Sequence, residues 1–242
     1  MTVNRIDVWV ETKRKYRGQP REKSKKYTKV PVIQDKPYYS NSKVYNFKMD
    51  IIDAAIFYKK QGYNPLLLNM ADWNIPGGSV EFGSIAQEEE CFRRSNYFNH
   101  LTKDHYPMGK LDVVYSKDVE FYRLGANYQY KILDEPIKLD MIASPSLRHP
   151  QLSEDYKKFG NESDILLMTD KIRMLLSVGV ENKHDIIVLS SWGCGVYGCP
   201  PIHMAKLFRN VIEKEFSNLF EGIVFAIHDE KTYDIYNDVF SL

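Results

Sequence analysis

Residues 185–228 constrain the fold of this chain most, because they indicate a strand, a glycine-rich loop, a helix and a second strand in that order. Asp185–Ser190 is mostly apolar and short enough for a buried strand, and Gly222–His228 has the same character. Between them lie a glycine- and proline-rich stretch, Ser191–Pro201, and then apolar residues at helical spacing. The pattern predicts a βαβ unit whose loop directs a helix N-terminus at a bound anion.

The rest of the chain alternates in the same way, and its 242 residues, 43% of them hydrophobic, are enough to bury a sizeable core. Helical periodicity predicts helices over Asp50–Lys60 and Glu162–Val178, the second ended by Gly179. Shorter stretches that look extended are Val44–Phe47, Leu66–Leu68, Leu111–Tyr115, Val119–Leu124, Tyr128–Ile132 and Met141–Ser144. We find no fixed-period repeat, so the sequence predicts an α/β fold, a three-layer α/β/α domain with a mixed central sheet.

A second informative feature is a glycine turn that precedes a run of glutamates. Pro76–Gly78 is a strong turn signal, and glycines without a Cβ let the main chain approach a phosphate or a sugar closely. Ser84 stands three residues before Gln87, which is the spacing of a capping box. We therefore expect a helix to begin there, with apolar residues recurring as far as Leu101.

Glu88 and Glu89 fall in the first turn of this helix, where the helix N-terminus stabilises anions. Because consecutive helical residues are rotated by about 100°, the two carboxylates cannot address one atom from the same direction and should have different roles. An acidic, solvated first turn of an ordinary helix is the alternative interpretation. The adjoining glycine turn favours a site with acid or base chemistry.

The second glycine loop also permits a dinucleotide site. Gly193, Gly195 and Gly198 match Gly-x-Gly-x-x-Gly between a strand and a helix, as a dinucleotide fingerprint requires. The acidic ribose partner is expected about 20 residues further on, where Lys214 and Glu215 still belong to the predicted helix. An NAD-dependent enzyme is therefore a remote alternative.

Metal binding is weighed against the same loop. Cys194, Cys199 and His203 have a spacing close to that of zinc ligands, but a fourth ligand is not obvious, and we expect no metal and no cofactor. Three widely spread cysteines argue against a disulfide framework and for a reducing setting. With no export signal and no membrane-spanning run, the sequence predicts a cytoplasmic protein, or a nuclear one in a eukaryotic host.

The first forty residues differ in composition from the rest. Residues 13–29 contain nine lysines and arginines, opposed only by Glu22, although the net charge of the whole chain is +1. We predict a basic N-terminal arm or extension over residues 1–40, most simply a solvated one, and a single large domain over residues 41–242. The alternative role of the arm is contact with a polyanion such as nucleic acid.

These residues together resemble a known family. Pro76–Gly78, eight further residues, Gln87-Glu88-Glu89 and then Arg93-Arg94-Ser95 look like the signature of the microbial-type poly(ADP-ribose) glycohydrolases, which have the macrodomain fold. The resemblance extends over residues 44–74, 138–145, 191–201 and 223–229 and leaves the first forty residues unexplained. It implies that residues 41–242 form a macrodomain-like poly(ADP-ribose) glycohydrolase domain.

The resemblance also implies a role for each matched position. Glu89 matches the catalytic acid of the family, and Glu88 matches the glutamate that positions the ribose. Substrate contacts are implied for the two glycine loops, for two asparagines before the first loop and for the signature glutamine: Pro76, Gly77, Gly78, Ser79, Val80, Gly193, Cys194, Gly195, Val196, Tyr197, Asn69, Asn74 and Gln87. One position departs from the pattern, because the family usually has a third glycine where this chain has Ser79.

The implied chemistry is hydrolysis of the ribose–ribose O-glycosidic bond, whose leaving hydroxyl needs a proton to depart. Glu89 would supply that proton and then activate water, while Glu88 would hold a ribose hydroxyl. A side chain at Ser79 would crowd the ribose or donate a hydrogen bond to it. The alternatives are therefore a macrodomain that binds ADP-ribose without cleaving it, or one that removes a single ADP-ribose. The expected partners are poly(ADP-ribose) or an ADP-ribosylated protein or nucleic acid, and no membrane.

Overall fold

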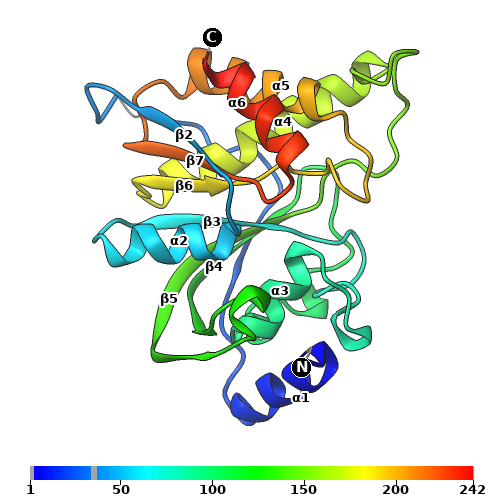
Figure 1. Cartoon of the computed structure of the whole chain (residues 1–242). Coiled ribbons are helices and arrows are strands. Elements are labelled where there is room, and N and C mark those ends of the chain that lie inside the picture. The colour runs from blue at the N-terminus through cyan, green and yellow to red at the C-terminus, as the bar shows by residue number, and fades with distance from the viewer. Residues whose placement is uncertain (1–2, 34–36, 242) are drawn as a thin grey trace.

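A mixed sheet of seven strands forms the middle of the computed structural model, which describes residues 3–33 and 37–241 (Figure 1). In the order in which they lie side by side, the strands are β1 (Lys25–Tyr27), β4 (Val113–Arg123), β5 (Ile132–Ser144), β3 (Pro65–Met70), β6 (Ile186–Leu189), β7 (Gly222–Ala226) and β2 (Lys43–Phe47). The run from β5 to β2 is parallel, whereas β4 is antiparallel to both β5 and β1. The predicted mixed sheet is confirmed.

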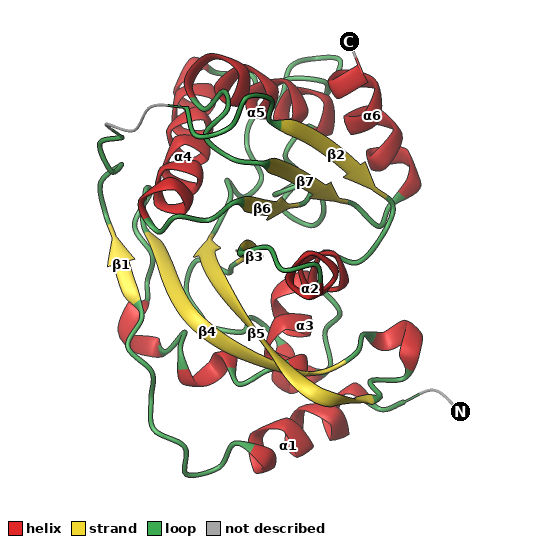
Figure 2. Cartoon of the chain, turned by 90° about the vertical axis from the view of Figure 1, so that its left-hand side faces the viewer, coloured by secondary structure: helices red, strands yellow, loops and turns green. Residues whose placement is uncertain are grey.

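Helices cover both faces of this sheet. Their bounds are α1 Arg5–Lys15, α2 Ile51–Lys60, α3 Gln87–Arg94, α4 Glu162–Glu181, α5 Pro201–Glu215 and α6 Glu230–Ser241. Figures 1 and 2 show α2 and α3 on one side and α4, α5 and α6 on the other. Because both faces are covered, the central strand β3 is apolar on both sides, and Leu66, Leu67 and Leu68 are fully buried. The three-layer arrangement is confirmed, and so is the βαβ unit formed by β6, α5 and β7.

Two helix ends differ from the prediction. α4 runs through Gly179 to Glu181, because a Cβ on Gly179 would lie 2.6 Å from the side chain of Ile187 and glycine lets the helix pack closely on β6. α3 ends at Arg94, where Ser95 turns to extended backbone and pairs with Phe121 of β4. Both predictions were made from local composition, whereas in the structure a contact with the sheet determines where each helix ends.

The capping box predicted before α3 is also absent. The residue that precedes the helix is Ala86, and no side chain caps the helix start. The guanidinium of Arg93 instead binds the main-chain carbonyl of Ser84. Two expected extended stretches, Leu111–Tyr115 and Val119–Leu124, belong largely to the single strand β4, and a 3-10 turn precedes β5 where Tyr128–Ile132 was expected to be extended.

The basic N-terminal segment is folded onto the rest of the molecule. α1 packs on α3, and Trp9 of α1 is 4% exposed with its ring 5.3 Å from that of Phe98. The Thr12 hydroxyl lies 2.6 Å from the main-chain oxygen of Arg93, to which it donates. β1 pairs with the edge of β4. The expectation of a solvated arm is therefore wrong for these elements, because a buried helical stripe lies within the charged sequence; the domain boundary at residue 40 stays a prediction.

Several of the basic residues in this segment are neutralised by acids elsewhere. Ion pairs join Lys13 to Glu81, Arg21 to Asp104, Lys25 to Glu181 and Lys26 to Asp112. Within residues 3–33 and 37–241, no helix is both long and apolar enough to cross a lipid bilayer.

The packing of α1 predicts a large effect of Trp9→Ala on stability. Removing a buried indole should lower the free energy of unfolding by about 3–5 kcal/mol. Val10→Ala is the matched control, because Val10 follows directly in the same helix and is 48% exposed, and it should change the value by less than about 0.5 kcal/mol. Denaturant titration measures both. Equal small shifts for the two variants would mean that α1 is not docked.

Candidate active site

Three loops meet where the parallel strands β5, β3 and β6 end. The strands are neighbours that point the same way, so the segments that follow them leave the same edge of the sheet. The Trp73 indole, after β3, donates to the Ser146 carbonyl, after β5, at 2.7 Å. The Tyr197 hydroxyl, after β6, donates to the Asp72 carboxylate at 3.1 Å. The two glycine loops predicted to share a ligand are thereby held side by side.

The N-terminus of α3 is fixed to the end of β3 by Gln87. Its side-chain amide donates to the Leu68 carbonyl at 2.9 Å, and its side-chain oxygen accepts from the Met70 amide at 2.8 Å. Both polar ends of Gln87 are therefore occupied by the main chain of β3. Gln87, which is predicted as a substrate contact, thus also fixes the position of Glu88 and Glu89, the next two residues of the helix.

Glu88 is buried, with 3% of its surface exposed, and is surrounded by donors. One oxygen accepts from the Asp72 amide at 2.8 Å, and the other lies 3.2 Å from the Asn69 side-chain nitrogen and 3.3 Å from the Tyr106 hydroxyl. Burial raises the pKa of Glu88 to about 8, although the hydrogen bonds from Asp72 and Asn69 act in the opposite direction. Glu88 thus holds the start of the first glycine loop.

Glu89 has a different environment, as the helical rotation between the two residues predicts. Its side chain is 6% exposed, and one oxygen accepts from the Ser79 amide at 3.0 Å. The other oxygen, Oε2, is buried and has no hydrogen-bond partner within the described part of the chain. A buried carboxylate oxygen normally has a partner, so the described residues leave the hydrogen-bonding capacity of this one unsatisfied.

Gly77 and Gly78 are both required where they stand. Gly77 has φ +78°, and a Cβ there would lie 2.6 Å from the Phe92 ring. Gly78 has φ +51°, and a Cβ there would lie 2.7 Å from Oε1 of Glu89. The turn is therefore pressed against α3, which brings its main chain next to the catalytic candidates. Pro76 is half-buried and Val80 is buried.

The third position of the turn tolerates its serine. Ser79 has φ −103°, which any residue adopts without strain, and its side chain is exposed. Its amide, which contacts Glu89, does not depend on the side chain. Asn74, on the same loop, is also exposed, whereas Asn69 is fully buried beside Glu88.

The second glycine loop is shaped by close packing at its start and is open at its tip. Gly193 has φ +78°, and a Cβ there would collide with the Ser146 hydroxyl. Gly195 has open space around its Cβ position, and Val196 is 80% exposed. Cys194 is half-buried, and burial raises the pKa of its thiol. The tip is thus accessible to a ligand on the side of Tyr197.

Lys171 of α4 contacts both loops from within the protein. Its ammonium lies 5.0 Å from the centre of the Trp73 ring and 5.8 Å from that of the Trp192 ring, and it donates to the Lys110 carbonyl at 2.6 Å. The residue is 1% exposed, and this burial lowers its pKa to about 7. Lys171 therefore packs one indole from each loop around a single buried amine.

Three residues of this site have no sequence prediction. Asp72 joins the two loops, Tyr106 contacts Glu88 from a distant segment, and Lys171 supports both indoles. Asp72 lies between Asn69 and Asn74, shortly before the glycine turn, so its position in the sequence could have indicated a role in the site. Tyr106 and Lys171 reach the site only through the fold.

The structure gives little support to the two alternatives based on the second loop, a zinc site and a dinucleotide site. Nδ1 of His203 accepts from the Phe159 amide at 3.0 Å, and the Cys199 thiol donates to the Leu147 carbonyl at 3.4 Å. Among the residues described, no cluster of three or more histidine, cysteine or acidic side chains is arranged to hold a metal ion. The strand order also differs from that of the doubly wound dinucleotide fold.

A family model, "Microbial-type PARG, catalytic domain", where PARG is poly(ADP-ribose) glycohydrolase, matches residues 7–124. The resemblance of this chain to the microbial-type PARGs is thereby confirmed. The match includes the first glycine turn, Glu88 and Glu89, whereas the loop at residues 193–199 lies beyond it. A search of the curated proteins finds no match to the sequence.

Solved PARG structures have the same fold as this chain. PARG from Thermomonospora curvata has a TM-score of 0.81 at 20% identity, over 97% of this chain and 98% of that chain. PARG from Deinococcus radiodurans in complex with ADP-ribose has a TM-score of 0.70 at 22% identity, over 100% of this chain and 93% of that one. The similarity in fold therefore extends over both glycine loops and the N-terminal segment.

Gly78→Ala should lower PARG activity by about 100-fold, because its Cβ would displace the carboxylate of Glu89 by a large part of an ångström. Phe82→Ala is the control, since Phe82 is 84% exposed in the segment that follows the turn, and it should remain active. Steady-state hydrolysis rates measure the effect, with circular dichroism to establish folding. Full activity of folded Gly78→Ala would contradict the close approach of the turn to α3.

Proposed function

We propose that the protein hydrolyses the ribose–ribose O-glycosidic bonds of poly(ADP-ribose) and releases ADP-ribose, with Glu89 as the general acid and base. The observation that carries this proposal is the state of the Glu89 carboxylate. One of its oxygens is held by the Ser79 amide, and the other is buried and unpartnered within the described residues. The free oxygen lies beside the glycine turn, whose positive-φ backbone without Cβ atoms lets a phosphorylated sugar approach the main chain closely.

The reaction needs one group that changes its protonation state. As the bond between the two riboses breaks, protonated Glu89 gives its proton to the departing hydroxyl oxygen, and positive charge develops on the ribose carbon. The carboxylate then removes a proton from the attacking water, whose oxygen bonds to that carbon. Burial of Glu89 excludes bulk water from its free oxygen.

Glu88 is assigned to positioning. Its carboxylate is already held by the Asp72 amide and the Asn69 side chain, so its orientation is fixed before substrate binds. Burial raises the pKa of Glu88 to about 8, and its oxygens retain lone pairs that can accept a hydrogen bond from a ribose hydroxyl. Glu88 thereby orients the sugar relative to Glu89.

We assign the diphosphate and the distal ribose to the two glycine loops. The turn at residues 76–80 and the loop at residues 193–197 are joined through Tyr197 and Asp72, so one diphosphate group can contact both. Support comes from the related structures, since the Thermomonospora curvata protein has been solved with the inhibitor ADP-HPD and the Deinococcus radiodurans protein with ADP-ribose.

A binding protein or a hydrolase for single ADP-ribose groups is the second candidate, and Ser79 is the residue that favours it. The exposed serine side chain stands where the family usually has glycine, next to the proposed ribose position. The backbone at Ser79 is unstrained and its amide still contacts Glu89, so the machinery of the first candidate is retained. This geometry favours polymer hydrolysis.

The basic N-terminal segment is proposed as a secondary contact for the polymer, through the residues that lack ion pairs. Within the described chain, five of the nine basic residues in this segment, unlike the paired ones, have no acidic partner: Arg14, Lys15, Arg17, Lys23 and Lys29. Their charge would attract a polyanion without sequence or structural specificity.

Glu89→Gln should reduce the release of ADP-ribose from poly(ADP-ribose) by about 100-fold or more, because the amide cannot transfer a proton. The affinity for ADP-ribose, measured by calorimetry, should change little because the amide is of equal size. Glu81→Gln is the matched control, since Glu81 lies in the same segment but is exposed and paired with Lys13.

Undiminished release by Glu89→Gln would refute the assignment of the acid. Binding of ADP-ribose by the unmodified protein without any release from polymer would refute polymer hydrolysis and support the binding protein. Tighter binding of NAD than of ADP-ribose would support the dinucleotide alternative.

A further inference from the structure

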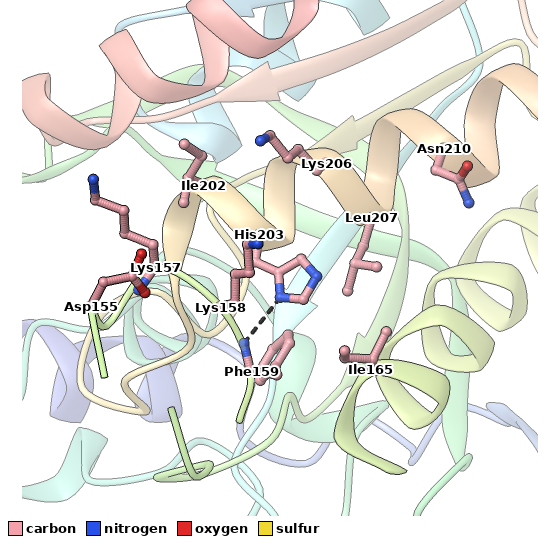
Figure 3. A pocket seen from close by; sticks show the side chains of 10 residues that line it. All are labelled: Asp155, Lys157, Lys158, Phe159, Ile165, Ile202, His203, Lys206, Leu207 and Asn210. Atoms are coloured by element: carbon pink, nitrogen blue, oxygen red, sulfur yellow. Dashed lines mark hydrogen bonds between the residues drawn. The ribbon is translucent and has the colours of Figure 1, made fainter. Parts of the chain in front are cut away.

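A cavity lies outside the candidate active site, between α5 and the loop that precedes α4. Its volume is about 470 Å³, within the range of about 300–1,000 Å³ that small-molecule sites occupy. Figure 3 shows the side chains that line it. The floor is apolar and includes an aromatic ring: Phe159, Ile165, Ile202 and Leu207.

The rim of this cavity is basic. Lys157, Lys158 and Lys206 line it, against the single acid Asp155, and none of the three lysines has an ion pair within the described chain. The Asp155 carboxylate is occupied by the Ser153 hydroxyl at 2.7 Å and by the Lys157 amide at 3.1 Å. The rim therefore carries more positive than negative charge, which would attract an anionic ligand.

His203 adds a fixed donor to the floor. Its Nδ1 accepts from the Phe159 amide at 3.0 Å, so the proton of the neutral ring is on Nε2, which points away from that bond on the side of Leu207 in Figure 3. Burial, together with the charges of Lys158 and Lys206, lowers the pKa of His203 and keeps the ring neutral near pH 7. A hydrogen-bond donor thus stands between an apolar floor and a basic rim.

The loop that carries Lys157 and Lys158 is preorganised. The Ser153 amide donates to the Lys158 carbonyl at 3.0 Å, and the Lys158 amide donates back to the Ser153 hydroxyl at 3.1 Å. The Gly160 amide donates to the Gln151 carbonyl at 2.7 Å. A ligand at the rim would therefore meet lysines on an ordered turn, which reduces the entropy lost on binding.

Two segments of the chain connect the cavity with the second glycine loop. α5 begins at Pro201, directly after that loop, and supplies Ile202, His203 and Lys206 to the cavity. The other wall is part of the segment after β5, and in this segment the His149 amide donates to the Tyr197 carbonyl at 2.7 Å. In that segment the Arg148 guanidinium lies 5.7 Å from the centre of the Tyr197 ring. Arg148 thus adds a positive charge beside the proposed diphosphate loop, in the segment that leads along the chain to the cavity.

We propose that this cavity is a second subsite for poly(ADP-ribose), which binds the phosphates and the base of a unit beyond the neighbouring one while one unit occupies the glycine loops. The inference rests on the proposed function. A nucleoside diphosphate fits the chemistry, because its flat base matches the floor of Phe159 and Ile202 and its phosphates match the lysine rim. Longer chains would bind both sites at once, which raises their effective affinity above that of a single unit.

The test compares substrates of different length on the double variant Lys158→Ala/Lys206→Ala. Its kcat/KM on long polymer should fall about five- to tenfold, the size expected from two lost phosphate contacts. Its kcat/KM on the two-unit oligomer and its Kd for ADP-ribose should be unchanged. Lys131→Ala/Lys138→Ala is the control for bulk charge, since both residues are exposed on or beside the distant β5 strand and should leave all three values unchanged.

A fall in kcat/KM that is equal for long polymer and for the two-unit oligomer would overturn the subsite, and so would a fall of the same size in the control variant. Titration of labelled long polymer keeps the two proposals separate, because it needs no hydrolysis. If the unmodified protein does not cleave polymer but Lys158→Ala/Lys206→Ala still loses its preference for long chains, the proposed function fails and the cavity stands. If cleavage is normal and chain length has no effect on binding by the unmodified protein, the cavity fails alone.

Discussion

The docking of the N-terminus of α3 on the end of β3 is the interaction on which the site depends. Gln87 binds the main chain of β3 at two points, and Glu88 accepts from Asn69 and from the Asp72 amide. These contacts occupy the polar side-chain atoms of Gln87 and much of the hydrogen-bonding capacity of the Glu88 carboxylate. Glu89, one step further around the helix, is left with a buried free oxygen beside the glycine turn. Support and chemistry are therefore divided between adjacent residues of a single helical turn.

The sequence predicts the layers of the fold well where periodicity and turn signals agree. The strand, glycine loop, helix and strand at residues 186–226 stand as expected, and so does α2 with Asp50 at its N-terminus. The errors have a common cause in long-range packing. Gly179 continues α4 because it contacts Ile187, and α1 is folded because Trp9 and its neighbours on the helix are covered by α3 and the segment after it. Neither contact is visible in local composition, and in α1 the surrounding charges conceal the apolar stripe.

The sequence predicts the loops of the site better than the contacts between its side chains. The glycine turn and the two adjacent glutamates can be placed from spacing alone, because their backbone geometry is local. The roles of the side chains around them depend on which strands are neighbours. Gln87 is predicted as a substrate contact, and in the structure its side chain also binds the main chain of β3, whereas Tyr106 and Lys171 reach the two loops from distant segments. The serine at position 79 is explained only by its φ of −103°, which removes any need for glycine.

The most direct test of this account is a crystal structure of the protein with ADP-ribose bound. The account predicts that the diphosphate lies between the turn at residues 76–80 and the loop at residues 193–197. It also predicts that Oε2 of Glu89 lies within about 3 Å of the distal ribose, where a hydrogen bond forms. A ligand bound away from the two loops, or a distal ribose that faces Glu88 while Oε2 of Glu89 remains unpartnered, would contradict it.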